Sequence, residues 1–309
     1  MSVDPAGMVG SVGPVGSVGP PTWVAPVGSA APGGPRESAG SGRRVLRYAL
    51  LTVLAGLILF PVYATVVNSL STPTEITPFP WFPASPNWEN YSKAWSQGHL
   101  SKYLLNSAIV TIAITAGQVV TAIMAAYAFA FLRFPLRRLL FVVFLTTLMI
   151  PAEVTILQNV KTVRPWDGDL TYLALIVPSL ASGFGAFLLR QSFLQVPKEL
   201  REAAFLDGYG HLRFMTRIVV PLTRPAIAAM GLFAFLGAWN QYLWPLLVTS
   251  DAPEYRTVQY GLKQLAGGSL DQIGVTYAGT VLAFLPIAVL LMVFSKQLVR
   301  GLTAGAVKG

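Results

Sequence analysis

Long runs of apolar residues alternate along the chain with short polar segments. Each of these runs approaches the roughly 20 residues that an α-helix needs to cross the hydrocarbon core of a bilayer. The runs cover residues 48–69, 104–132, 139–157, 172–193, 227–248 and 275–294. Local kinks are expected at the prolines inside them, Pro61, Pro178, Pro245 and Pro286. The pattern predicts an all-α polytopic membrane protein with six transmembrane helices and with both termini on one side.

The first 42 residues differ from the rest of the chain. They are rich in Gly, Pro, Ser and Val, and they show no helical periodicity. This composition is typical of a disordered tail. A signal peptide is not expected, because a basic segment followed by a continuous apolar core is absent. We therefore divide the chain into a disordered tail at 1–42 and a transmembrane domain at 43–309.

Composition supports a membrane protein and excludes several chemistries. Hydrophobic residues make up 53% of the chain and charged residues 11%, whereas soluble domains carry about 25% charged residues. The chain has no cysteine, which excludes disulfides, thiol nucleophiles and cysteine-ligated metals. Its two histidines, His99 and His211, are too few for a histidine-based metal cluster.

The net charge of +9 is explained by the distribution of lysines and arginines between the two sides of the predicted membrane. Sixteen of the 22 lysines and arginines fall on one side of the predicted membrane: Arg36, Arg43, Arg44, Arg47, Arg133, Arg137, Arg138, Arg190, Lys198, Arg201, Arg213, Arg217, Arg224, Lys296, Arg300 and Lys308. Because cytoplasmic loops carry such an excess, both termini and the loop at 190–224 are predicted to be cytoplasmic. Nucleic acid is therefore not an expected partner.

Two loops stand out. The outer segment at 70–103 is rich in proline and aromatic residues, which fits either a folded surface at the membrane interface or an aromatic belt. The cytoplasmic loop at 195–225 is too patterned for a simple connector. Pro197 suits the start of a short helix, and Gly208 suits the left-handed conformation that ends one. One face of that helix is expected to carry Leu200, Ala203, Ala204 and Asp207.

This loop resembles the EAA signature of the permeases of binding-protein-dependent ABC importers. The matching residues are Glu202, Ala203, Ala204, Gly208, Ile218 and Pro221, with Val220 where the signature usually has leucine. The resemblance implies a type I ABC importer permease fold. It also implies that the loop, including Asp207, forms a coupling helix that docks onto a cytoplasmic ATPase. Independently of the family, an amphipathic helix lying on the membrane surface is the structural alternative.

The resemblance extends from Arg44 onward to the carbohydrate-uptake branch, which includes maltose-type permeases. Segments 134–137, 148–154 and 239–247 look closest to the second permease subunit of sn-glycerol-3-phosphate importers. A permease for a disaccharide or oligosaccharide such as maltose or trehalose is the alternative. The first 42 residues match nothing in the family pattern. The family implies a bacterial inner-membrane location.

Family membership also implies a set of partners. These are a homologous second permease subunit, two copies of an ABC ATPase that binds ATP and Mg²⁺, and an extracytoplasmic solute-binding protein. The sequence contains no Gly-x4-Gly-Lys-Ser/Thr phosphate loop, so this chain is expected to bind no nucleotide cofactor and to perform no ATP hydrolysis itself. It is predicted to be a transport subunit and not an enzyme.

Polar groups inside the predicted spans are candidates for the solute path, because they are costly unless they face protein or water. The candidates are Trp239, Asn240, Gln241, Tyr242 and Glu153. Amides and aromatic faces near the middle of the fifth span suit a polyhydroxy solute, and interhelical hydrogen bonding is the alternative for the two amides. Glu153 is the only acidic residue within a predicted span. Its side chain either lines the path or reaches the nearby interface by snorkelling.

Other residues have plainer explanations. Arg190 fits the positive-inside pattern better than a phosphate contact. His211 is expected to be a contact or solvated residue and not a ligand. The C-terminal segment 301–309 is expected to contact the ATPase as a regulatory element. An ion-coupled secondary transporter remains an alternative function, although no inverted repeat and no second intramembrane acid is evident.

Overall fold

The computed structural model describes residues 39–76, 81–96, 99–166, 171–269 and 272–303, and in these residues every regular element is a helix. Most of the predicted tail, residues 1–38, lies outside the described residues, as do 77–80 of the outer segment and 304–309 of the C-terminal segment. Residues 39–42, expected to belong to the tail, instead begin helix α1 (Ala39–Ser69). The expected all-α class is confirmed.

Three described helices are long and apolar enough to cross a membrane: Arg44–Ser69 in α1, Leu100–Phe131 (α3), and Ile273–Ser295 within α14 (Ile273–Thr303). Three bent helix pairs raise the number of candidate spans to as many as six. Two of these pairs overlap the expected third and fourth spans. The remaining pair, His211–Leu222 with Arg224–Trp239, is bent by 83° and begins before the fifth span expected at 227–248.

The third, fourth and fifth expected spans are interrupted. The third comprises α4 (Arg137–Thr146), a 3₁₀ turn and α5 (Ala152–Val163), with a bend of 97°. The fourth comprises α6 (Thr171–Ile176), the 3₁₀ turn η4 (Val177–Ser179) and α7 (Gly183–Phe193), with a bend of 43°. Prolines contribute to both interruptions, since Pro151 precedes α5 and Pro178 lies in η4.

The fifth expected span, 227–248, consists of two helices. Helix α11 (Arg224–Trp239) ends where the span was expected to continue, and α12 (Leu243–Val248) follows after a short break. Two further helices lie in the connections between the longer ones, α2 (Glu89–Ser96) and α13 (Val258–Ala266).

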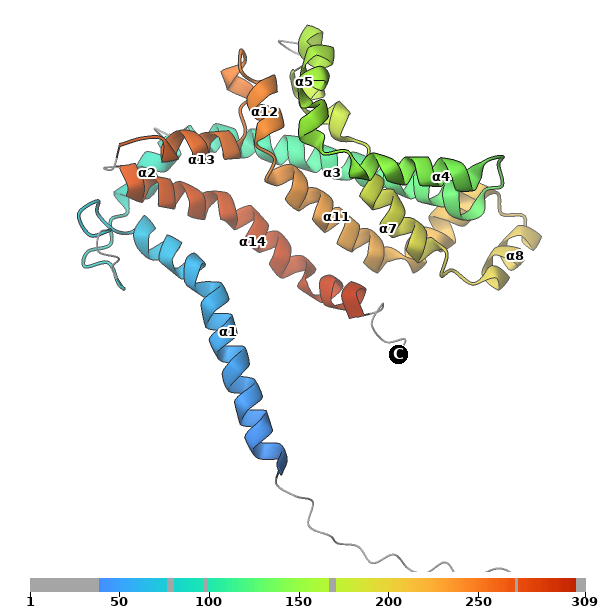
Figure 1. Ribbon diagram of the computed structural model, residues 1–309, viewed down its shortest axis with the longest axis horizontal. Coiled ribbons are helices and arrows are strands. Elements are labelled where there is room, and N and C mark those ends of the chain that lie inside the picture. Colours follow the sequence, from blue (N-terminus) through green and yellow to red (C-terminus); the bar gives the residue numbers. More distant parts are fainter. Residues whose placement is uncertain (1–38, 77–80, 97–98, 167–170, 270–271, 304–309) are drawn as a thin grey trace, which may run out of the picture. The chain divides into compact units, whose positions relative to one another are not determined.

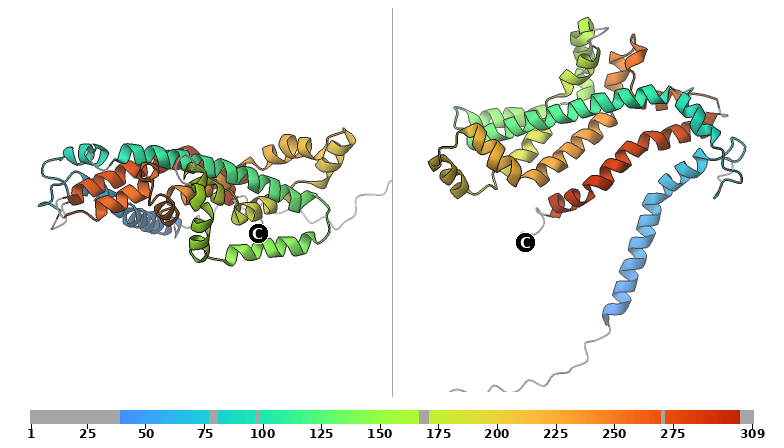
Figure 2. Two further views of the ribbon diagram at one scale, coloured as in Figure 1. Left: turned by 90° about the horizontal axis from the view of Figure 1, so that it is seen from above. Right: turned by 180° about the vertical axis from the view of Figure 1, so that it is seen from behind.

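Residues 56–309 form one compact unit, in which α3 has the central place. It packs along α7 and α11, and α11 in turn packs on α14, which also contacts α2 and α13 (Figures 1 and 2). Glycine permits close approach between α7 and α11, because a Cβ on Gly185 in α7 would lie 2.4 Å from the methyl carbon of Met230 in α11. The core therefore depends on small residues where helices meet, as is common in membranes.

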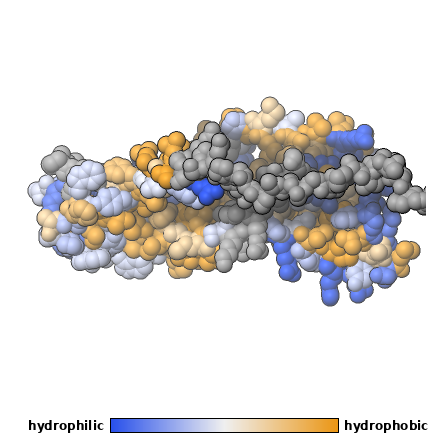
Figure 3. All heavy atoms as spheres, turned by 90° about the horizontal axis from the view of Figure 1, so that it is seen from below, coloured by the Kyte–Doolittle hydropathy of each residue, from blue (hydrophilic) through white to orange (hydrophobic). Residues whose placement is uncertain are grey.

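Large apolar side chains remain exposed on several helices of this unit. Val142 and Val143 in α4 and Val289, Met292 and Val293 in α14 each expose more than half of their surface. Hydrophobic side chains also cover much of the surface seen in Figure 3. Exposed apolar side chains of this kind suit contact with lipid.

The outer segment contains the folded helix α2. The Asn90 amide nitrogen donates hydrogen bonds to the carbonyl oxygens of Ser69 and Ser71, both at 3.0 Å. Trp81 and Phe82 are exposed just before α2. The segment therefore combines a tethered helix with exposed aromatic side chains of the kind found in an aromatic belt.

Candidate functional site

The signature segment folds as a short helix with a defined end. Helix α8 (Lys198–Leu206) begins directly after Pro197, which fixes the entering backbone. At its end, Gly208 has a φ of +77°. Its N–H donates to the carbonyl of Phe205 at 3.1 Å, and the N–H of Tyr209 donates to the carbonyl of Ala204 at 2.9 Å. This pair of bonds is a Schellman motif, so the expected glycine-ended helix is confirmed.

Replacing Gly208 with alanine tests this helix end. A side chain at positive φ costs about 1 kcal/mol, and a Cβ there would meet only open space, so the loss is conformational and not steric. We expect Gly208→Ala to lower the free energy of unfolding in detergent by roughly that amount. Gly210→Ala is the matched control, because Gly210 has a φ of −77° and also faces open space. Equal losses in both variants would contradict the assignment.

The two signature alanines have different environments. Ala204 is 4% exposed and belongs to a core cluster with Phe193 and Phe214. Ala203 lies on the exposed surface, together with Asp207 and Glu202. The four residues expected on one face therefore do not share one environment. Ala204 is buried in the protein, whereas the other three are exposed. Only part of the predicted low-relief surface is available to a partner.

Aromatic rings join this loop to the end of α3. Phe214, which ends helix α9 (His211–Phe214), is fully buried. Its ring lies edge-on to Phe131 in α3, with a centroid distance of 5.4 Å, and 5.9 Å from the ring of Phe205 in α8. Packed aromatic rings therefore connect α8 and α9 directly to the end of α3.

His211 contacts protein groups on two elements. Its Nδ1 is 2.9 Å from the hydroxyl oxygen of Tyr127 in α3, and its ring lies 5.2 Å from that of Phe205. The expectation that His211 is a contact residue is confirmed. The hydrogen bond gives α9 a polar connection to α3 in addition to the ring contact between Phe214 and Phe131.

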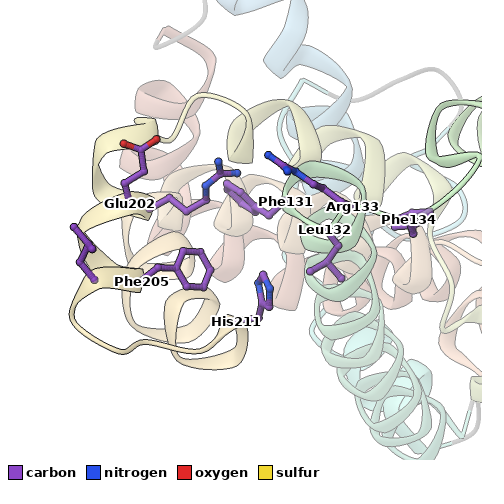
Figure 4. A pocket seen from close by; sticks show the side chains of 9 residues that line it. Phe131, Leu132, Arg133, Phe134, Glu202, Phe205 and His211 are labelled. Carbon is purple, nitrogen blue, oxygen red and sulfur yellow. The ribbon is translucent and has the colours of Figure 1, made fainter.

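A cavity of 830 Å³ lies beside these contacts, between α8, α9 and the end of α3. Figure 4 shows the rings of Phe205 and His211 along this cavity and the carboxylate of Glu202 turned away from them. Leu206 also lines the cavity and is 88% exposed. Among the described residues, no cation lies within ion-pair distance of Glu202. An exposed leucine beside an unpaired carboxylate is the kind of surface that a protein partner covers.

The last two signature residues connect α8 to α11. Ile218 lies in a π-helical turn, Met215–Val219, and packs partly buried against the core cluster. Pro221 follows in α10 (Val220–Leu222). Because proline has no N–H, it removes an α-helical donor directly after this wider turn. The segment leading into α11 therefore departs from regular α-helix where the signature has its proline.

The candidate path residues lie at a helix break and not in the middle of a helix. Trp239 is the last residue of α11, buried and stacked on Phe235 with ring centroids 5.7 Å apart. Asn240 is exposed, and its Oδ1 accepts a bond from Gln259 in α13 at 3.4 Å. The amide oxygen of Gln241 is buried without a hydrogen-bond partner in the described part of the chain. Tyr242 immediately precedes α12. The two amides therefore follow a helix end, and they do not lie inside one continuous helix as expected.

Glu153 lies on a separate element, in the first turn of α5, where its side chain is exposed. A negative charge at a helix N-terminus is favourable. Arg190 has a structural role in α7, since its guanidinium lies 4.1 Å from the ring centroid of Phe141 and its Nε donates to the carbonyl of Phe129 at 3.3 Å. These contacts favour the structural explanation of Arg190.

Sequence reasoning missed Asn106, which is buried in α3. Its Nδ2 donates to the carbonyls of Glu254 and Arg256 at 2.7 and 2.9 Å, and its Oδ1 accepts from the hydroxyl of Tyr172 at 2.8 Å. The available signal was an amide inside a predicted span, the criterion applied to Asn240.

We expect Asn106→Leu to lower the free energy of unfolding by about 1–3 kcal/mol, because it leaves two carbonyls and one hydroxyl of a partly buried network without their partner. Chemical unfolding in detergent micelles measures the loss. Asn159→Leu, at an exposed position in α5, is the control and is expected to change stability by less than about 0.5 kcal/mol. A loss in Asn106→Leu no larger than in this control would show that the hydrogen bonds contribute nothing.

Comparison with known proteins identifies the class of this chain. Residues 118–304 match the family described as binding-protein-dependent transport system inner membrane component, and the chain belongs to this family. It is therefore a multi-pass inner-membrane permease and a non-catalytic transport subunit. The family implies two kinds of partner, an ATPase and a solute-binding protein.

Several relatives carry one particular name, sn-glycerol-3-phosphate transport system permease protein UgpE. The protein from Yersinia pestis bv. Antiqua (strain Antiqua) is 35% identical over 271 residues, which cover 84% of this chain and 96% of the relative. The protein from Rhizobium meliloti (strain 1021) is 36% identical over 272 residues, covering 84% and 95%. The protein from Brucella abortus (strain 2308) is 37% identical over 268 residues, covering 82% and 94%.

A solved structure shares the fold. It is a chain of a bacterial ABC transporter involved in the import of the acidic polysaccharide alginate, with a TM-score of 0.73 and 20% identity. The match covers 84% of this chain and 98% of that chain. The ABC importer permease fold expected from the signature is confirmed.

Proposed function

We propose that this chain is the second permease subunit of an ATP-driven importer for sn-glycerol-3-phosphate or a glycerophosphodiester. The observation that carries the proposal is the agreement in name among relatives that are 35–37% identical and aligned over nearly their full length. The chain pairs with a homologous permease subunit above two copies of the ATPase, which bind ATP and Mg²⁺. Alternating access moves the solute between the two permeases.

In this proposal, α8 is the coupling element. Its accessible residues Glu202, Ala203 and Asp207 contact the ATPase, while Ala204 on its inner side belongs to the core cluster that includes Phe214. The ring contacts of Phe214 and Phe205 support a direct transfer of force to α3. Gly208 defines the helix end, and the turn containing Ile218 and leading to Pro221 carries the motion into α11.

The topology of the proposal follows the charge distribution. Both termini and the loop at 195–225 are cytoplasmic, because most lysines and arginines lie on that side. The break around Asn240 and Gln241, with Trp239 and Tyr242 on either side, borders the solute path. Glu153 is exposed in α5, and we assign it to the edge of the path.

Uptake by the reconstituted importer tests the solute. The complete complex, with its binding protein, is placed in proteoliposomes that contain ATP, and uptake of labelled sn-glycerol-3-phosphate, glycerophosphocholine and maltose is measured. We expect the first two to accumulate and maltose to be excluded. Accumulation of maltose alone would replace the proposed solute by a disaccharide. Uptake that persists without the ATPase and stops with an ionophore would indicate a secondary transporter.

A further inference from the structure

A second cavity, of 320 Å³, lies where three elements of the helical core meet. Its walls come from α3, from the interruption between η4 and α7, and from the end of α11 (α3, α7 and α11 are labelled in Figure 1). Gln118, Ser182, Gly237 and Gln241 are among the residues that line it. Non-helical backbone at membrane depth is tolerated where it is buried in protein or lines a water-filled cavity. The cavity therefore accounts for the toleration of a helix interruption at this place.

The polar groups of this cavity are incompletely satisfied. The Oε1 atom of Gln241 is buried, and no described residue donates a hydrogen bond to it. The amide nitrogen of Gln118 donates to the carbonyl of Ser179 at 2.7 Å, which fixes that side chain. The hydroxyl oxygen of Ser182 accepts from the N–H of Gly185 at 3.0 Å, so its own proton is available for donation. The cavity thus presents a free acceptor and a free donor.

We infer that this cavity receives the hydroxyl-bearing part of the transported solute, with the amide oxygen of Gln241 accepting a hydrogen bond from a solute hydroxyl. An amide oxygen requires a donor, which an alcohol supplies and an ionised phosphate does not. The lining includes no lysine or arginine that would hold a phosphate. Its volume lies within the range of about 300–1,000 Å³ that is usual for small-molecule sites. The inference rests on the proposed import function and names the contact that this chain supplies.

Thiol labelling tests the inference, because the chain contains no cysteine. A Cβ at Gly237 would meet only open space, so Gly237→Cys introduces one thiol into the cavity without a clash. The complete permease–ATPase complex in nanodiscs, without the binding protein, is treated with a cationic methanethiosulfonate reagent, and labelled chain is quantified by mass. Leu236→Cys, on the same helix but outside the cavity lining, is the matched control.

Solute is expected to slow the labelling of Gly237→Cys but not that of Leu236→Cys. Bound solute lowers the labelling rate by the factor 1 + [L]/Kd, where [L] is the solute concentration. A solute at ten times its Kd therefore slows labelling roughly ten-fold. sn-Glycerol-3-phosphate and glycerol are expected to protect, and inorganic phosphate is not. Adding Gln241→Leu to Gly237→Cys is expected to raise the Kd by roughly five-fold, the loss of one hydrogen bond. Gln264→Leu, at an exposed position in α13, is the control and is expected to leave this Kd unchanged.

The possible outcomes separate this inference from the proposed function. Labelling that no solute affects, in a complex that still imports sn-glycerol-3-phosphate, would overturn the cavity assignment alone. Equal protection by inorganic phosphate would overturn the hydroxyl contact. Protection by glycerol and maltose but not by sn-glycerol-3-phosphate would support the cavity and overturn the proposed solute.

Discussion

Replacing Glu202 by lysine is expected to abolish most uptake and to weaken binding of the ATPase. The carboxylate lies on the accessible side of α8 at the rim of the 830 Å³ cavity, and no described cation pairs with it. Reversing its charge in a docked interface costs about 2 kcal/mol or more, which is roughly 30-fold in affinity. The measurements are solute uptake in proteoliposomes and co-purification of the ATPase with the affinity-tagged permease.

The fold is expected to survive this substitution, because an exposed side chain on a short helix contributes little to stability. Asp251→Lys is the matched control. It reverses an exposed acid between α12 and η6 (Pro253–Tyr255), on the side predicted to face away from the ATPase. Uptake and co-purification at wild-type levels in Glu202→Lys would show that Glu202 takes no part in docking. Equal losses in both variants would indicate a general effect of charge.

Replacing Phe214 by alanine is expected to lower the free energy of unfolding by about 3–5 kcal/mol, because a fully buried ring is lost and a void remains. The void opens between α8 and the end of α3, where the Phe214 ring contacts Phe131 and Phe205. The complex that still assembles is expected to hydrolyse ATP with reduced uptake per ATP. Unfolding in detergent and the ratio of transport to hydrolysis measure the two effects.

Phe284→Ala is the control for the loss of a phenylalanine, since Phe284 in α14 is 42% exposed. We expect it to cost less than about 1 kcal/mol and to leave the transport-to-hydrolysis ratio unchanged. If Phe214→Ala proves no more destabilising than Phe284→Ala, the ring cluster is not a structural core. If its stability falls but the ratio does not, the cluster supports the fold without transmitting motion.

Helix positions were predictable from the sequence where local composition decides them. The apolar run 104–132 became α3 (Leu100–Phe131), and the glycine-ended helix in the signature loop became α8. In both cases neighbouring residues along the chain supply the determining interactions. A run of apolar residues specifies burial and length, and Gly208 specifies a backbone conformation.

Interruptions were harder to predict because they depend on residues far away in sequence. The run 227–248 is apolar apart from Asn240 and Gln241 and is long enough for one span, yet its helix stops at Trp239. Beyond that point Asn240 bonds to Gln259 in α13, and Trp244 in α12 donates from Nε1 to the carbonyl of Leu175 at 3.2 Å. The residues of one run do not reveal hydrogen-bond partners that lie far away in the same sequence. The amides predicted to lie within a helix are therefore found just after its end.

The helical class, the family signature and the backbone conformation at Gly208 could all be predicted from the sequence, because each depends on composition or on residues a few positions apart. Tertiary packing was needed to tell which of Ala203 and Ala204 faces the core, since Ala204 shares its core cluster with Phe193 and Phe214 from other elements. Packing also brings His211 to Tyr127, 84 positions away, and brings together the three elements that line the cavity beside Gln241. Local propensity selects a helix, whereas packing between distant segments selects its buried face and its ends.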